Sequence, residues 1–68
     1  MKETKYHTYQ HELDGILRKA EVVLYPEGWK VIFYKNNVFH GAKALYAYNE
    51  MYAEDCAENF VMGIHDGV

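Results

Sequence analysis

Residues 22–34, with the sequence VVLYPEGWKVIFY, decide the fold of this chain, because two apolar runs flank a Pro-Glu-Gly turn. Both runs are rich in the β-branched and aromatic residues that half-buried strands prefer. Pro26 presets φ at the first position of the turn, and Gly28 can take the left-handed conformation that closes it. The stretch therefore predicts an antiparallel β-hairpin.

Two further turn signals extend this hairpin into a meander. Asp14-Gly15 can supply the positive φ angles of a two-residue type I′ turn, and Asn36-Asn37 tolerates left-handed geometry. We therefore expect four antiparallel strands, neighbouring in chain order. Their expected ranges are residues 5–13, 16–25, 29–35 and 38–45, with a bulge or an early end of the fourth strand at His40-Gly41.

The apolar period changes after Asn49 and becomes helical. Apolar residues then recur at spacings of three and four, at Tyr52, Ala53, Cys56, Ala57, Phe60, Val61 and Ile64. Asn49 is a suitable N-cap and Gly63 a natural stop. The expected fold is a single α+β domain over residues 1–68, in which one C-terminal helix packs on one face of the sheet.

The small size of the chain limits its stability and its class. A 68-residue domain buries only about 60% of the surface that its unfolded chain exposes, and small domains are commonly reinforced by disulfides, a metal or association. The single cysteine, Cys56, excludes an internal disulfide and fits either a reducing compartment or simply a buried thiol. The first five residues do not lead into an apolar run, and no run reaches the ~18 residues of a membrane span. We expect a cytoplasmic protein.

Both faces of the predicted sheet carry large apolar residues, but one helix can cover only one face. If Tyr25 pairs with Trp29, the first face gathers Tyr6, Val23, Tyr25, Trp29, Val31 and Phe33. The second face then gathers Tyr9, Leu13, Ile16, Val22, Leu24, Ile32, Tyr34 and Phe39. A one-residue change of register would regroup the third and fourth strands. In either register an apolar face remains uncovered, and such a face is typical of an interface.

The sequence thus predicts a protein-binding site made of two parts. The first is the aromatic face with Tyr6, Tyr25, Trp29, Val31 and Phe33, and the second is an acidic helix ridge of Glu50, Glu54 and Glu58. The face could bind another protein, form a homodimer, or be shielded by the terminal segments. The ridge could instead be an ordinary solvated helix face, because acidic residues are favourable in the first turn of a helix.

Catalytic and metal-binding patterns are not recognisable in the sequence. The chain has no serine, and no glycine-rich loop could hold a phosphate, so we expect no enzyme and no cofactor. His7 and His11 are four residues apart, which would suit a metal on a helix but places them ~13 Å apart on a strand. His40, His65 and Cys56 have no ligand-like spacing, and we therefore predict no metal site.

Nucleic-acid binding is a weaker alternative. The aromatic face could stack unpaired bases of single-stranded nucleic acid. However, ten acidic and seven basic side chains give a formal charge of −3, and Arg18 is the only arginine. Because Lys and Arg supply most of the affinity for phosphates, this composition argues against an unaided nucleic-acid binder.

Two stretches carry a resemblance to known proteins. Residues 16–29, ILRKAEVVLYPEGW, and residues 52–64, YAEDCAENFVMGI, resemble short accessory proteins of large tailed bacteriophages. The resemblance covers about half of the chain. It implies a phage-encoded modulator or inhibitor that binds a protein of the bacterial host, and it assigns no functional residue.

Overall fold

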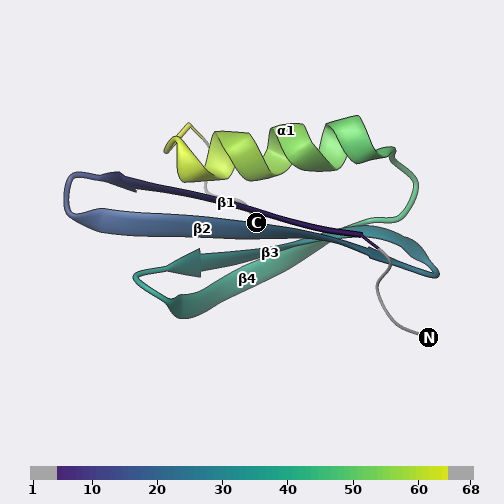
Figure 1. The fold of residues 1–68 in the computed structure, drawn as a ribbon, viewed down its shortest axis with the longest axis horizontal. Helices are drawn as coiled ribbons and strands as arrows, with labels where there is room; N and C mark the ends of the chain where they lie inside the picture. The colour runs from purple at the N-terminus through teal and green to yellow at the C-terminus, as the bar shows by residue number, and fades with distance from the viewer. Residues whose placement is uncertain (1–4, 65–68) are drawn as a thin grey trace.

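A meander of four antiparallel strands followed by one helix makes up the fold (Figure 1). The computed structural model describes residues 5–64, with side chains from residue 7 onward. The strands are β1 (Lys5–Leu13), β2 (Ile16–Tyr25), β3 (Gly28–Lys35) and β4 (Val38–Leu45), and the helix is α1 (Glu50–Val61). The predicted fold class is confirmed, and β3 begins one residue earlier than expected.

The tight turns follow the local chemistry of their residues. Asp14 and Gly15 have φ angles of 55° and 78°, and Asn36 and Asn37 have 52° and 66°. These left-handed values suit the type I′ geometry that matches the twist of a hairpin. The Asn36 side chain also accepts a hydrogen bond of 3.0 Å from the backbone N–H of Leu17. That bond ties the second of these turns to β2.

The β2–β3 turn sets the register of the sheet. It contains only Pro26 and Glu27, because Gly28 takes a φ of 139° and pairs with Tyr25. Leu24 is therefore the partner of Trp29. The pairing of Tyr25 with Trp29 that defined the two predicted faces is wrong by one residue. Side chains alternate along a strand, so this shift places every β3 side chain on the other side of the sheet from that expected.

The core lies between the sheet and the helix. Helix α1 runs along one side of the sheet and packs against β2, β3 and β1 (Figure 1). The rings of Phe33 and Phe60 have their centroids 4.6 Å apart at its centre. The buried residues of this core are Ala20, Val22, Val31, Phe33, Leu45, Ala53, Ala57, Phe60 and Val61.

Both predicted helix ends are confirmed. Asn49 Oδ1 accepts a hydrogen bond of 3.0 Å from the backbone N–H of Tyr52, which satisfies one of the unpaired amides of the first turn. At the other end, Gly63 has a φ of 80°, and the N–H of Ile64 donates to the carbonyl of Asn59 at 3.0 Å. This left-handed glycine stops the helix, and the bond from Ile64 satisfies one of its last carbonyls.

A bulge interrupts the pairing of β3 with β4. Phe39 pairs with Tyr34 and Gly41 pairs with Phe33, so His40 is the extra residue. The bulge predicted at His40-Gly41 is confirmed, and β4 continues beyond it to Leu45. The His40 ring stacks on Phe60 with centroids 5.8 Å apart, on the helix side of the sheet.

Candidate functional site

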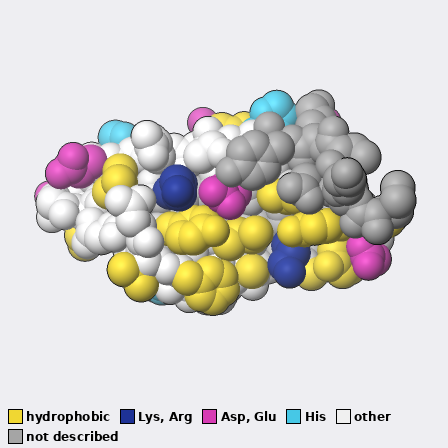
Figure 2. Space-filling view, turned by 60° about the horizontal axis from the view of Figure 1, so that its bottom comes forward, with side chains coloured by type: hydrophobic (Ala, Val, Ile, Leu, Met, Phe, Trp, Pro, Cys, Tyr) yellow, Lys and Arg dark blue, Asp and Glu magenta, His cyan; other side chains and the backbone are white. Residues whose placement is uncertain are grey.

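The side of the sheet that faces away from α1 is the candidate functional surface. Strand alternation places on it the residues between the buried ones of β2 and β3. Figure 2 brings this side forward and shows hydrophobic side chains gathered in a band, with charged side chains among them. We call it the open face and define it by Lys19, Glu21, Val23, Tyr25, Lys30, Ile32, Tyr34, Phe39, Ala42 and Ala44.

Exposure on the open face increases toward the edge strand β4. Val23 is only 3% exposed, although it is not part of the core under the helix. Ile32 and Tyr34 are half-buried, whereas Phe39 is 63% exposed. The Phe39 ring meets Tyr34 edge-on, with centroids 6.3 Å apart. The largest accessible apolar group of the open face is therefore an aromatic pair next to the edge of the sheet.

The charged groups of the open face are arranged around its tyrosines. Lys19 Nζ lies 4.7 Å from the ring centroid of Tyr34 and 3.9 Å from Glu21 Oε2. The Tyr34 hydroxyl donates a hydrogen bond of 3.4 Å to Glu21 Oε1. Lys30 Nζ lies 5.8 Å from the ring centroid of Tyr25. The alkyl chains of the lysines thus add apolar contact area, and the negative charge of Glu21 offsets the positive charge of Lys19. This face is therefore apolar and nearly neutral.

The residues of the predicted aromatic site do not all lie on the open face. Val31 and Phe33 are fully buried beneath α1, so their prediction as exposed interface residues is wrong. Trp29 lies on the same side and packs half-buried against the core. The cause is the two-residue turn, which shifts β3 by one position. Tyr25 does lie on the open face, and the side chain of Tyr6 is outside the described residues.

The sequence-based prediction missed several residues of the open face because of the same one-residue shift of β3. Ile32 and Tyr34 take the places on the open face that were expected for Val31 and Phe33. Phe39 joins them because the bulge at His40 keeps it opposite Tyr34. The length of the β2–β3 loop was the signal that could have found them, since one residue decides the parity of the whole strand.

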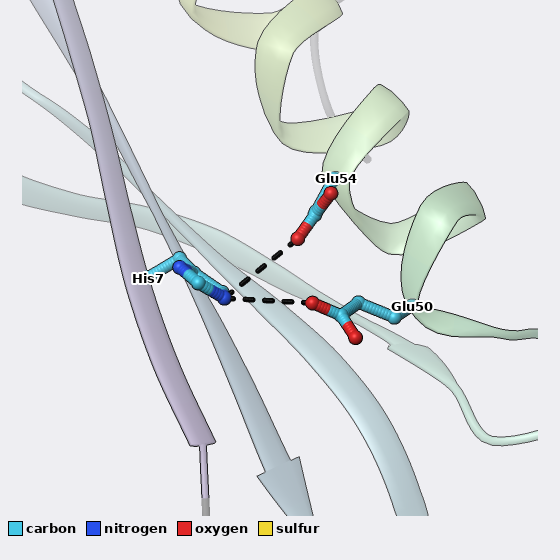
Figure 3. A network of polar contacts seen from close by, with 3 residues as sticks. All are labelled: His7, Glu50 and Glu54. Carbon is cyan, nitrogen blue, oxygen red and sulfur yellow. Dashed lines mark ion pairs between the residues drawn. The ribbon is translucent and has the colours of Figure 1, made fainter.

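The predicted acidic ridge is divided by the fold. Glu50 and Glu54 are half-buried and point toward His7 of β1 (Figure 3). Glu58 is exposed. His7 Nε2 lies 3.5 Å from Glu50 Oε2 and 3.7 Å from Glu54 Oε2. Nearby, burial and the carboxylates of α1, led by Glu54, raise the pKa of the Tyr9 hydroxyl. The carboxylates of Glu50 and Glu54, in the first two turns of the helix, therefore point toward the sheet.

A shallow groove lies beside the helix. It is lined by Lys43 of β4 and by Tyr52, Asp55, Cys56 and Asn59 of α1, and its volume is about 280 Å³. Ligand pockets of globular proteins are usually about 300–1,000 Å³ and strongly enclosing, so this groove is small for a ligand. Burial raises the pKa of the Cys56 thiol, while the Lys43 ammonium acts in the opposite direction. The thiol is therefore mostly protonated at neutral pH and is a weak nucleophile.

Comparisons with known proteins add no assignment of family or function. No family model matches the chain, and no curated protein or solved structure matches it significantly. Among residues 5–64, no helix has the length and apolar character needed to cross a membrane. The open face and the cluster around His7 are thus the features from which function is inferred.

Proposed function

We propose that this chain is a non-enzymatic protein-binding module whose open face docks onto another protein. The observation that carries the proposal is the exposure of Phe39 beside Tyr34, on a face that is apolar and nearly neutral. The resemblance to phage accessory proteins extends the proposal to a modulator of a bacterial host protein. Such a protein would act in the cytoplasm of the host.

The energetics of the open face favour a macromolecular partner. Fully burying an exposed phenylalanine side chain is worth about 1.5–3 kcal/mol, and aromatic residues dominate the energy of protein interfaces. Removing the open face from water costs little in desolvation, because its charges are few and Lys19 already lies near Glu21. The helix side, with Glu50, Glu54 and Glu58, is the more costly side to cover.

The dimensions of the molecule indicate how much of the open face a partner must use. The two largest extents of the Cα trace, 36 and 19 Å, give one side a footprint of about 700 Å², close to the roughly 800 Å² that each partner contributes to a standard interface. A stable complex therefore engages most of the open face. A suitable partner offers an apolar centre that receives Phe39 and a carboxylate near Lys30, because Glu21 already lies near Lys19.

The experiment begins with affinity purification from a bacterial host lysate and continues with the purified partner. Binding is measured for the wild type, for Phe39→Ala and for Met51→Ala. Met51 is the matched control because it is equally apolar and 70% exposed but lies on α1. We expect Phe39→Ala to weaken binding by roughly tenfold or more and Met51→Ala to leave it unchanged.

Sedimentation of the wild type at micromolar concentration decides between a different protein and a second copy. We expect a monomer that becomes a heteromeric complex when the purified partner is added. A dimer that dissociates in Phe39→Ala would assign the open face to self-association and would overturn the proposal of a different partner. Equal binding by wild type and Phe39→Ala would show that the open face is not the docking surface.

A further inference from the structure

Three side chains with metal-binding groups converge where β1 faces the first two turns of α1. His7 comes from the edge strand, and Glu50 and Glu54 are one helical turn apart on the side of α1 that faces it (Figure 3). One potential ligand atom from each residue lies within 4.8 Å of the other two. The fold thus brings together an imidazole and two carboxylates that are distant in sequence.

The Nε2 atom of the His7 imidazole points into this cluster without a hydrogen bond. The Nε2 atom of His7 is buried from solvent and has no hydrogen-bond partner among the described residues. Its distances to the two carboxylate oxygens, 3.5 and 3.7 Å, exceed the 2.7–3.2 Å that is typical of an N–H···O bond. A buried nitrogen of this kind is normally paired, because an unsatisfied polar atom is costly. His7 Nε2 therefore lies at ion-pair distance from both carboxylates without a hydrogen bond to either.

The spacing of these atoms matches the coordination shell of a small transition-metal ion. Tetrahedral zinc binds nitrogen and oxygen ligands at about 2.0–2.2 Å, which places neighbouring ligand atoms about 3.3–3.6 Å apart. The distances from His7 Nε2 to Glu50 and Glu54 are 3.5 and 3.7 Å, so small side-chain rotations would complete the shell. The side chains of His7, Glu50 and Glu54 are 40%, 35% and 32% exposed, so the cluster lies at the margin of the core and an ion could reach it from solvent.

The donor set also selects the class of ion. Ca²⁺ and Mg²⁺ prefer shells made entirely of oxygen, whereas an imidazole with two carboxylates suits Zn²⁺ and related first-row ions. A divalent cation would also remove the repulsion between two like charges at i and i+4 on one helix. We propose that His7, Glu50 and Glu54 form a binding site for a divalent transition-metal ion such as Zn²⁺, which fastens α1 to the edge strand β1.

Such an ion would act on the part of the fold that closes the core. It would join the N-terminal strand to the start of the C-terminal helix, and these two segments have no covalent link to each other except through the whole meander. An ion that binds only the folded chain stabilises it in proportion to its saturation. This site is independent of the open face, because α1 lies on the other side of the sheet.

Isothermal titration of the metal-free protein with Zn²⁺ tests the proposal. We expect one equivalent to bind to the wild type and expect no saturable binding of Ca²⁺ or Mg²⁺. His7→Gln and Glu54→Gln should each weaken Zn²⁺ binding by roughly tenfold or more, since each removes one ligand of three. The matched controls are His11→Gln, on the same strand, and Glu58→Gln, which removes the same charge one turn further along α1. Both should bind like the wild type.

The midpoint of urea unfolding gives a second readout. Zn²⁺ should raise the midpoint of the wild type and of both controls, and should leave that of His7→Gln and Glu54→Gln unchanged. Far-UV circular dichroism checks that each variant is folded, and Glu54→Gln decides the result if His7→Gln is not. Absence of Zn²⁺ binding to the wild type, or wild-type affinity in a folded His7→Gln or Glu54→Gln variant, would overturn the proposed site.

Discussion

Phe33 and Phe39 are the same residue type in neighbouring strands of one sheet, yet they have opposite environments. Phe33 is fully buried against Phe60 of the helix, whereas Phe39 is 63% exposed beside Tyr34. Phe33 faces α1 from the internal strand β3, whereas Phe39 lies on the other side of the sheet, on the edge strand β4. The comparison indicates that the first ring serves stability and that the second is available for binding.

The two sides of the sheet differ in charge as well as in whether a helix covers them. On the helix side, Glu50 and Glu54 approach His7 at the margin of the core. On the open face, the ammonium groups of Lys19 and Lys30 lie near tyrosine rings. Negative charge therefore gathers on the side that carries the helix. The open face is left with the lower cost of desolvation, which is what a docking surface requires.

The largest expected effect separates Phe33 from Phe39. We expect Phe33→Ala to lower the free energy of unfolding by about 3–5 kcal/mol, because it leaves a cavity against Phe60 in a small core. Phe39→Ala should change it by no more than about 0.5 kcal/mol, as for most surface substitutions. Urea unfolding followed by circular dichroism measures both. Similar losses in the two variants would contradict the division into a covered and an open side.

The hairpins and the helix were predictable from sequence because their signals are local. Asp14-Gly15 and Asn36-Asn37 fix two hairpins through the conformations of their own residues. Asn49 and Gly63 mark the ends of the helix through hydrogen bonds within one turn. Each signal depends on the chain within a few residues, so no tertiary information was needed.

The parity of β3 was not settled by sequence, because Pro26-Glu27-Gly28 fits a loop of two or of three residues and the segment that packs against Gly28 is distant along the chain. A Cβ atom at position 28 would lie 2.8 Å from the Cα atom of Tyr46, which no real side chain tolerates without a shift of the backbone. Gly28 is therefore required both by its φ angle and by the chain that follows β4. The sequence shows a glycine in a turn but does not show that the backbone of Tyr46 lies against it. The cluster of His7 with Glu50 and Glu54 was missed for the same reason, since the distance along the chain hides the pairing.

A smaller effect tests how much the N-cap stabilises the helix that covers one side of the sheet. We expect Asn49→Ala to lower the free energy of unfolding by about 1 kcal/mol, because the N–H of Tyr52 loses its cap. The matched control is Asn59→Ala, an exposed asparagine of the same helix that caps nothing with its side chain among the described contacts. This control should be neutral or slightly stabilising, since alanine is the better helix former. Chemical unfolding measures both, and equal losses would remove the role of the cap.

The smallest expected effect is a dependence of stability on alkaline pH that arises on the helix side. Burial raises the pKa of Cys56 above its ordinary value of 9.0, and burial with nearby carboxylates raises that of Tyr9 above 10.0. The unfolded chain therefore releases these protons at lower pH than the folded protein does. Their contribution to stability is fully present below the unfolded pKa values and is lost as the pH rises through the folded ones.

Stability curves of the wild type, Cys56→Ala and Tyr9→Phe from pH 7 to about pH 11 isolate this contribution. We expect the free energy of unfolding to fall less steeply above pH 9 in Cys56→Ala, and less steeply above pH 10 in Tyr9→Phe, whatever their stability at pH 7. The slope is the deciding quantity, because a lost packing contact shifts the whole curve whereas a lost titration changes only its alkaline part. Slopes equal to that of the wild type would mean that neither group titrates differently in the folded protein, and the helix would then cover this side less tightly than Phe33 and Phe60 indicate.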